Sequence, residues 1–141
     1  MSSNEAEQIS QLLKTAKTIA VVGLSDSPLR PSYGVTQYMR AHGYRIIPVN
    51  PNLTEWEGVK SYPSLLEVPD KVDIVDVFRR SSAVPGVVEQ AIEIHAPAIW
   101  MQEGVEDEQS ADKARAAGIF VVMDRCILKE HRRRMLDAQS R

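Results

Sequence analysis

The sequence of 141 residues contains one cysteine and three histidines, and no apolar run approaches the ~18 residues that a membrane-spanning helix requires. A single cysteine excludes an intramolecular disulfide and fits a reducing compartment. Residues 1–15 are polar and acidic, unlike a signal peptide. The histidines have no neighbouring ligands at zinc spacing. We therefore expect a cytoplasmic protein without a membrane span, a disulfide or a metal site.

Charge of neither sign dominates the composition. The 17 Lys and Arg residues against 19 Asp and Glu residues give a formal net charge of -2, which argues against a general nucleic-acid binder. Hydrophobic residues make up 43% and charged residues 26%, as in ordinary globular proteins. The length fits one domain over residues 1–141, large enough to bury a core.

The closely spaced glycines of a dinucleotide-binding loop are also missing. That fingerprint is G-x-G-x-x-G after a strand, whereas Gly23 is followed by Ser25, Ser27 and two prolines before Gly34. Residues 19–22 form an apolar run typical of a strand buried on both faces. Glycine permits a sharp turn there, and the next helix start offers N–H groups to an anion. A plain structural turn and a phosphate-binding loop both fit this stretch.

Strand and helix patterns alternate along the chain. Strands are predicted at residues 19–22, 45–49, 72–78, 98–101 and 119–123. Helical spacing or helix boundaries occur around residues 4–16, 35–42, 84–95 and 107–117, and a basic helix starts at residue 127. This alternation requires right-handed crossovers and a parallel sheet. We expect an α/β, Rossmann-like, doubly wound sheet of five parallel strands in the order 3-2-1-4-5.

Four segments are predicted to meet at the carboxyl ends of these strands, where such sheets bind ligands. The predicted order puts the switch point between the first and fourth strands. The segments are the loop from Gly23, the Asn50–Pro51 turn, residues 77–80 and residues 101–104. They supply hydroxyl and amide donors, an apolar lip and guanidinium groups, which suit a nucleotide.

Two positions refine the expected ligand. Neighbouring side chains of an extended segment point to opposite sides, so Arg79 is predicted to face the ligand and Arg80 to face away. An NAD site needs a carboxylate after the second strand, and here Asn50 and Pro51 follow it. Neutral and basic neighbours suit an adenosine that carries extra phosphate, because a carboxylate would repel it.

Six segments carry a family resemblance. They are V-V-G-L-S at residues 21–25, P-S-Y-G at 31–34, P-V-N-P at 48–51, D-I-V-D-V-F-R at 73–79, W-M-Q-E-G-V at 100–105 and M-D-R-C at 123–126. Together they resemble the small stand-alone CoA-binding proteins with a Rossmann-like fold, which are similar to the CoA-binding domain of the succinyl-CoA synthetase α subunit. The resemblance covers nearly the whole chain.

The resemblance implies that coenzyme A, or an acyl-CoA, lies in the crevice. It implies the following contacts: Gly23, Leu24, Ser25, Ser32, Tyr33 and Gly34 with the pyrophosphate, Asn50 and Pro51 on the adenosine side, and Val77, Phe78 and Arg79 with the nucleotide and pantetheine. Arg30 is a further candidate because it lies in the same loop. The chain ends near the first domain of the synthetase, so the resemblance implies binding without the ligase reaction.

We expect a carrier, a sensor or an accessory protein without its own catalytic apparatus. Glu103 lies at the edge where a base is expected, but no nucleophile or second carboxylate that would work with it is identifiable. One alternative is a ligase or transferase component that a partner chain completes. Another is an NAD(P)-linked redox sensor. The expected partner is CoA, with no nucleic acid or membrane, and a homodimer or a partner protein stays open.

Cys126 has two interpretations. It is either a small buried apolar residue, or a thiol whose pKa is lowered by a helix start and by Arg125 and which forms a mixed disulfide with CoA. The fifth strand is expected to lie outside the crevice, so pantetheine would have to cross the sheet edge to reach this thiol.

Overall fold

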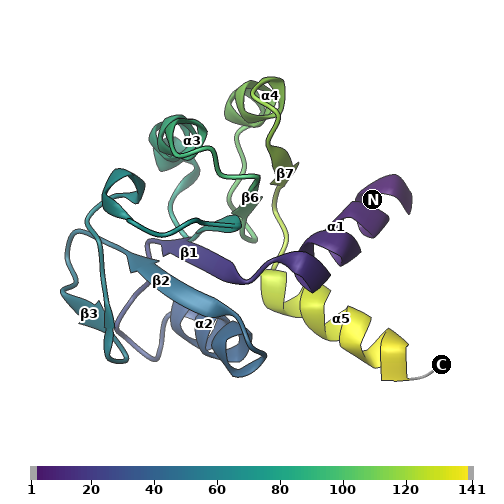
Figure 1. Cartoon of the computed structure of the whole chain (residues 1–141), viewed down its shortest axis with the longest axis horizontal. Helices are drawn as coiled ribbons and strands as arrows, with labels where there is room; N and C mark the ends of the chain where they lie inside the picture. The colour runs from purple at the N-terminus through teal and green to yellow at the C-terminus, as the bar shows by residue number, and fades with distance from the viewer. Residues whose placement is uncertain (1–2, 140–141) are drawn as a thin grey trace.

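The computed structural model describes residues 3–139, in which strands and helices alternate (Figure 1). The helices are α1 (Ser3–Thr15), α2 (Pro31–Ala41), α3 (Val84–Glu93), α4 (Glu108–Ala116) and α5 (Ile127–Gln139), with 3-10 turns η1 (Leu65–Glu67) and η2 (Ser81–Ala83). The strands are β1 (Thr18–Val22), β2 (Arg45–Val49), β3 (Glu55–Trp56), β4 (Val59–Lys60), β5 (Ile74–Val77), β6 (Ala98–Met101) and β7 (Phe120–Val122). None of the helices in this range is long and apolar enough to cross a membrane.

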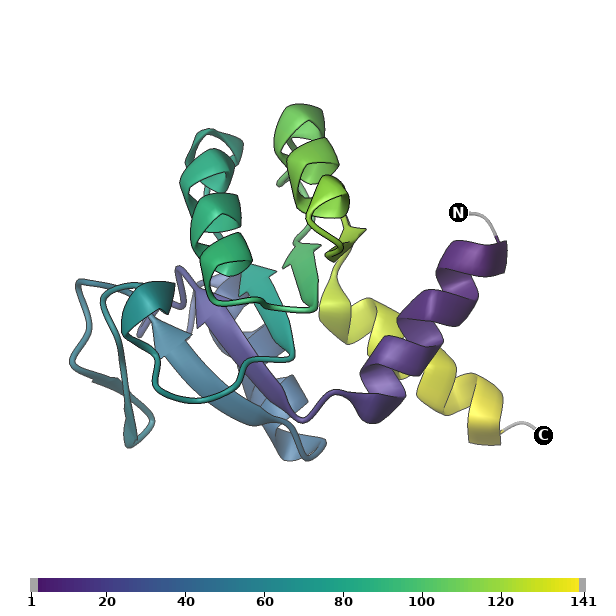
Figure 2. The same ribbon diagram turned by 45° about the horizontal axis from the view of Figure 1, so that its top comes forward.

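Helices cover both faces of one parallel sheet. Side chains alternate across a strand, so Val75 of β5 packs with the core beneath α3 and α4, while Ile74 packs with the core beneath α1, α2 and α5. Figure 2 shows α3 and α4 side by side on one side of the strands, with α1 crossing α5. Both central side chains are fully buried, which confirms the prediction of strands covered on two faces.

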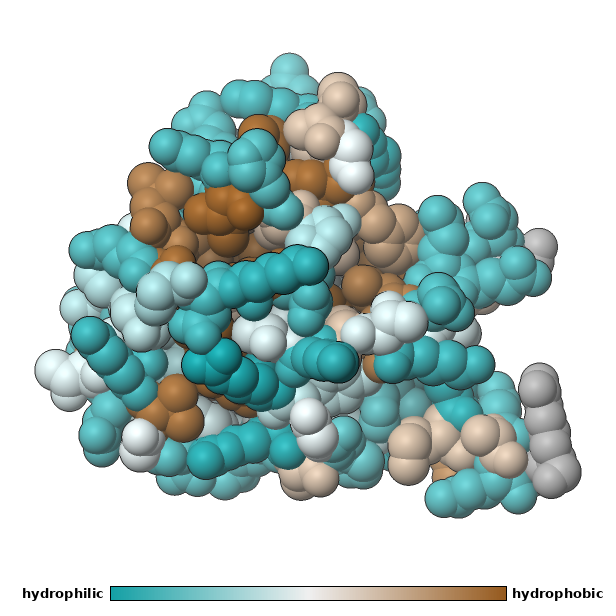
Figure 3. Space-filling model, in the orientation of Figure 1, coloured by the Kyte–Doolittle hydropathy of each residue, from teal (hydrophilic) through white to brown (hydrophobic). Residues whose placement is uncertain are grey.

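The outer surface is mostly polar. In Figure 3, hydrophilic residues cover most of the visible face, and apolar side chains show chiefly around α3 and α4 where these helices meet the sheet. The core therefore lies between the sheet and its two helix layers.

The five-stranded parallel sheet is confirmed, but the predicted strand order is wrong. The order is β2-β1-β5-β6-β7, so the third predicted strand, β5, pairs with β1 instead of lying outside β2. The switch point consequently lies between β1 and β5, where the order of strands reverses. The predicted crevice between the first and fourth strands moves to this position.

Two contacts explain why β5 does not lie outside β2. The outer edge of β2 is occupied by Tyr62, whose N–H donates to Pro48 and whose carbonyl accepts from Asn50. At the start of β5, the carboxylate of Asp73 accepts hydrogen bonds from the N–H groups of Lys17 and Thr18, at 2.9 and 3.0 Å. These bonds hold the beginning of β5 beside β1.

The first helix after β1 starts earlier than its apolar spacing indicates. Pro31 is the first residue of α2, where its missing N–H costs no helical hydrogen bond, and Arg30 before it is extended with φ -87° and ψ 140°. This start brings Ser32, which is buried, to the loop after β1. The helix N-terminus and that loop therefore form one unit.

Candidate functional site

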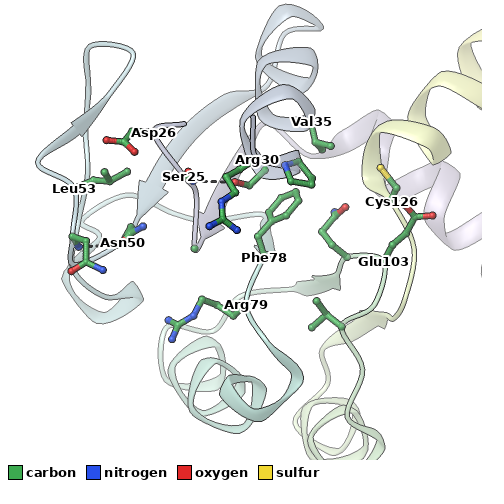
Figure 4. A pocket seen from close by; sticks show the side chains of 16 residues that line it. Ser25, Asp26, Arg30, Val35, Asn50, Leu53, Phe78, Arg79, Glu103 and Cys126 are labelled. Atoms are coloured by element: carbon green, nitrogen blue, oxygen red, sulfur yellow. Dashed lines mark hydrogen bonds between the residues drawn. The ribbon is translucent and has the colours of Figure 1, made fainter. Parts of the chain in front are cut away.

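A crevice of about 640 Å³ opens where β1, β2, β5 and β6 end (Figure 4). The residues that line it are Gly23, Ser25, Asp26, Arg30, Pro31, Ser32, Val35, Asn50, Asn52, Leu53, Phe78, Arg79, Gln102, Glu103, Val105 and Cys126. The volume is within the range of roughly 300–1,000 Å³ that is usual for small-molecule sites. The four predicted loops meet here, although the strand order differs.

Figure 4 shows how the side chains follow one another along the crevice. Asn50 and Leu53 lie toward one end, and Glu103 and Cys126 lie at the other. The guanidinium groups of Arg30 and Arg79 lie between these ends. The two arginines thus lie between an end that carries Asn50, Leu53 and the carboxylate of Asp26 and an end that carries Glu103 and Cys126.

Gly23 allows the loop after β1 to pack closely against the loop after β5. Its φ is +88°, and an added Cβ would lie 2.5 Å from the carbonyl oxygen of Phe78 and 2.8 Å from Cδ of Arg79. Its own N–H donates to the carbonyl of Val49 at 2.9 Å. Gly23 therefore shapes the crevice, and its N–H is already used within the chain.

Hydroxyl groups organise the loop that follows. The N–H of Ser25 donates to Oγ of Ser32 at 3.0 Å, and the N–H of Ser27 donates to Oγ of Ser25 at 3.0 Å. Each hydroxyl keeps its own hydrogen for a further bond. Within residues 3–139, the N–H of Ser32 makes no hydrogen bond, so it is free for an anion at the start of α2.

Arg30 and Arg79 bring positive charge to the crevice. Neither guanidinium forms a salt bridge with a carboxylate of the described chain. Arg79 also lines an adjoining hollow of about 230 Å³ together with Asn50 and Pro51, whereas Arg80 lines neither space. The predicted difference between the two neighbouring arginines agrees with this geometry.

Asn50 connects two of the converging loops. Its Nδ2 donates to the carbonyl of Leu24 at 2.9 Å, and its Oδ1 accepts from the N–H of Asn52 at 2.8 Å. The position that holds a ribose-binding carboxylate in NAD sites is therefore a neutral amide that braces the crevice wall.

A buried carboxyl lies below the wall that β6 contributes. Nε2 of Gln102 donates to Oδ1 of Asp76 at 2.6 Å, and both side chains are buried. Burial raises the pKa of the Asp76 carboxyl from 3.8 to about 7, against the lowering effect of the bond from Gln102. Asp76 therefore changes its protonation state near neutral pH while one of its partners lines the crevice.

Cys126 reaches the crevice because the loop before α5 is tied to β6. The N–H of Arg125 donates to the carbonyl of Met101 at 3.2 Å, and Nε1 of Trp100 donates to the carbonyl of Arg125 at 2.9 Å. Asp124 accepts from the N–H of Gly104 at 2.7 Å. The expectation that the last strand keeps Cys126 away from the crevice is wrong, since this loop turns back toward it.

The other group at this end is Glu103. Its carboxylate forms an ion pair with Lys129 of α5, with Nζ 3.0 Å from Oε2 and 3.1 Å from Oε1. The pairing links the loop after β6 to α5 and compensates the negative charge.

Among the predicted contact residues, Gly23, Ser25, Arg30, Ser32, Asn50, Phe78 and Arg79 line the crevice, and Pro51 lines the adjoining hollow. The side chains of four others lie elsewhere. Leu24 and Val77 are buried in the two cores, Tyr33 packs edge-on against Trp56 at 5.2 Å, and Gly34 has open space at its Cβ position. Contacts of these four residues with a ligand stay predictions.

The structure adds lining residues that are not among the predicted ligand contacts, namely Asp26, Pro31, Val35, Asn52, Leu53, Gln102 and Val105. Asn52 and Leu53 belong to the stretch after β2 that has no clear periodicity. Gln102 has a usable signal, because it follows a strand directly in the segment predicted to meet the others.

Comparison with known proteins finds small proteins that match over nearly their whole length and a much longer ligase that matches over a short part of its length. The uncharacterized protein YneT of Bacillus subtilis is 44% identical over 131 residues, covering 93% of this chain and 97% of that protein. A solved structure of a hypothetical protein from Pyrococcus horikoshii OT3 is 40% identical with a TM-score of 0.88, covering 91% of this chain and 90% of that chain. The ADP-forming acetate–CoA ligase II of Archaeoglobus fulgidus is 34% identical over 74 residues, covering 51% of this chain and 11% of the ligase.

A family model described as a CoA binding domain matches residues 17–132. The match spans the sheet, its crossover helices and the whole crevice. The predicted resemblance is confirmed, and with it the expectation of coenzyme A as the cofactor. The chain belongs to the CoA binding domain family.

Proposed function

We propose that this protein binds coenzyme A or an acyl-CoA in the crevice and acts as a carrier, a sensor or an accessory protein without catalytic apparatus of its own. The charge distribution carries the proposal. Arg30 and Arg79 have no carboxylate partner in the described chain, and they flank the middle of a crevice long enough to have chemically different ends. Unpaired guanidinium groups favour phosphate oxygens.

In this proposal the ligand lies along the crevice in one direction. The pyrophosphate lies at the start of α2, near the free N–H of Ser32 and the two arginines. The adenosine lies toward Asn50 and Leu53. Pantetheine passes the apolar side chain of Phe78 and brings its sulfur toward the end that contains Cys126.

The crevice residues support binding better than chemistry. Its lining contains no histidine or lysine. The hydroxyls of Ser25 and Ser32 accept from backbone N–H groups, and within residues 3–139 neither makes a hydrogen bond with the carboxylate of Asp26, which also lines the crevice. Glu103 is held by Lys129. A general base has to reach a substrate proton in an activated arrangement with its partners, and these contacts do not provide one.

Calorimetry with CoA, NAD and NADP tests the proposal. CoA is expected to bind at least roughly tenfold more tightly than NAD, because the wall after β2 carries the neutral Asn50 while the middle carries unpaired arginines. NAD binding as tight as that of CoA would overturn the assignment and favour the redox-sensor alternative.

Arg79→Ala is expected to weaken CoA binding by roughly 1–3 kcal/mol, the cost of losing a charge-assisted contact. Arg80→Ala is the matched control, since Arg80 is the adjacent arginine and lies outside the crevice. The same titrations measure both variants. A larger loss for Arg80→Ala would mean that the inward and outward assignment is reversed.

A second candidate is a ligase component that a partner chain completes. The similarity to part of the Archaeoglobus acetate–CoA ligase favours it, although this chain spans only 11% of that ligase. Native mass spectrometry of freshly purified protein separates the candidates. A retained CoA on a monomer or homodimer supports the binding protein, and a stoichiometric second chain supports the component.

A further inference from the structure

Asp76 and Gln102 form an isolated polar pair at the base of the crevice. In the sheet, Asp76 of β5 lies between Val21 of β1 and Trp100 of β6, both apolar. Its side chain is 1% exposed, and the hydrogen bond from Nε2 of Gln102 is the one that the described residues make to its carboxylate. Among the described residues, Gln102 is therefore the hydrogen-bond partner that joins this carboxyl to the crevice lining.

Gln102 connects the buried carboxyl to the crevice. Its Nε2 faces Asp76, while its Oε1 makes no hydrogen bond within residues 3–139. The buried side-chain atoms without a partner in that range are Oγ1 of Thr36 and Nε1 of Trp56, so Oε1 of Gln102 is not sealed from solvent. Because Gln102 lines the crevice, this oxygen is available to a bound molecule.

The protonation state of Asp76 limits which end of the amide it can hold, because an ionised carboxylate can hold Nε2 alone, whereas a protonated carboxyl can hold either Nε2 or Oε1. An ionised carboxylate only accepts, so it holds Nε2 and leaves Oε1, an acceptor, toward the crevice. A protonated carboxyl can donate to Oε1 after a half-turn of the amide, which leaves the Nε2 donors toward the crevice.

Both arrangements are accessible near neutral pH. Burial raises the pKa of Asp76 to about 7, so the carboxyl is protonated below that value and ionised above it. The charged or titratable groups on the surrounding elements are Asp26 and Arg30 between β1 and α2, Tyr33, Tyr38 and Arg40 in α2, Arg79 and Arg80 after β5, Glu103, Glu106 and Asp107 after β6, Asp124, Arg125 and Cys126 after β7, and Lys129, Glu130, His131, Arg132, Arg133, Arg134 and Asp137 in α5. Of these, Glu103 is paired with Lys129, and Glu130 with Arg133 and Arg134.

We propose that Asp76 is a positioning residue that, through Gln102, sets whether the sulfur end of the crevice prefers the thiol of CoA or the thioester carbonyl of an acyl-CoA. The inference rests on the proposed function. With Asp76 ionised, Oε1 of Gln102 accepts from the S–H of free CoA. With Asp76 protonated, Nε2 donates to the thioester carbonyl, which can only accept.

Gln102 lies at the correct end for this role. It lines the crevice and directly precedes Glu103, which Figure 4 shows with Cys126 opposite the end of Asn50 and Leu53. In the proposed direction of binding, that end receives the sulfur. The chemical difference between CoA and acetyl-CoA lies at the same position.

The test compares the dissociation constants of CoA, acetyl-CoA and S-ethyl-CoA by calorimetry under reducing conditions at about pH 6 and about pH 8, on either side of the pKa of Asp76. The ratio of the constants for acetyl-CoA and CoA is expected to rise about tenfold between the two pH values. Titration of the ligand phosphates and of the cationic side chains is common to both ligands, so it cancels in the ratio. S-ethyl-CoA has neither an S–H nor a carbonyl, and it reports any remaining pH effect.

Two variants assign the effect to the pair. Asp76→Asn cannot ionise and Gln102→Met removes the amide, so each is expected to make the ratio independent of pH while binding of S-ethyl-CoA persists. Asp73→Asn is the matched control. It changes an aspartate at the opposite end of the same strand segment, where the carboxylate holds the N–H groups of Lys17 and Thr18, and it is expected to keep the wild-type pH dependence.

A wild-type ratio that is equal at both pH values overturns the inference, and so does a Gln102→Met variant that keeps the wild-type dependence. Neither result affects the proposed function, because both ligands still bind. Failure of the proposed function is a different outcome, in which the wild-type protein binds none of the three ligands at either pH.

Discussion

Gly23→Val is expected to lower the free energy of unfolding by roughly 2–5 kcal/mol and to abolish measurable CoA binding. Left-handed backbone costs a non-glycine residue about 1–2 kcal/mol, and φ at Gly23 is +88°. Forcing a side chain into occupied space adds about 1–3 kcal/mol, and the carbonyl of Phe78 stands 2.5 Å from the new Cβ. Relief of this overlap would move the loops that carry Arg30 and Arg79.

Two other glycines provide control variants that separate the cost of a left-handed backbone from the cost of steric overlap. Gly118 has φ +85° with nothing within 4 Å of a Cβ, and Gly86 in α3 has neither a left-handed φ nor a neighbour within 4 Å. Gly118→Val is therefore expected to show strain alone, and Gly86→Val only the small helical cost of a β-branched residue.

Thermal unfolding and CoA titration of the three variants provide the measurement. The melting temperature of Gly23→Val is expected to fall by roughly 10–20 °C, with a smaller fall for Gly118→Val and retained CoA affinity in both controls. If Gly23→Val melted like Gly118→Val and bound CoA normally, the close approach to Phe78 would have no part in the site.

The sequence carries the fold class in its local patterns. Buried strands such as residues 19–22 and the helices between them are visible as apolar periodicity, and alternation then requires a parallel sheet. Strand order depends on contacts between residues far apart. The hydrogen bonds of Tyr62 at the edge of β2 and of Asp73 with Lys17 and Thr18 decide it, and neither has a signature in the sequence.

The residues of the candidate site also fall into those that the sequence predicts and those that only the folded structure shows. Residues directly after strands, such as Gly23, Asn50 and Arg79, are predictable because parallel strands end at one edge. Leu24 and Val77 are predicted with them, yet their side chains are buried in the two cores. The contact between Asp76 and Gln102 requires the register of β5 and β6, which only the folded sheet supplies.

Cys126 differs from these residues because a loop, and not a strand end, brings it to the crevice. Asp124 and Arg125 attach this loop to the end of β6, so the thiol lines the same space as Glu103 although β7 is the edge strand. The side chain is 7% exposed, and it is the single cysteine of the chain. Any adduct of the protein with a disulfide is therefore located at this residue.

We expect CoA disulfide to convert Cys126 to a protein–CoA mixed disulfide at least roughly tenfold faster than oxidised glutathione forms its own adduct. The thiolate of Cys126 attacks one sulfur of CoA disulfide, a new S–S bond forms, and the other CoA leaves as a thiolate that takes up a proton. Binding of the CoA moiety in the crevice raises the effective concentration of its sulfur at the thiol. Glutathione lacks the nucleotide and gains no such advantage.

Intact-mass measurement over time follows both reactions, with Cys126→Ser as the blank. An excess of S-ethyl-CoA is expected to slow adduct formation with CoA disulfide and to leave the glutathione reaction less affected, because it occupies the nucleotide site. In urea, where the crevice is lost, the two disulfides should react at similar rates. Equal rates in the folded protein would identify Cys126 as a packing residue, since a thiol that lines the crevice without meeting the sulfur end of the ligand gains nothing from binding.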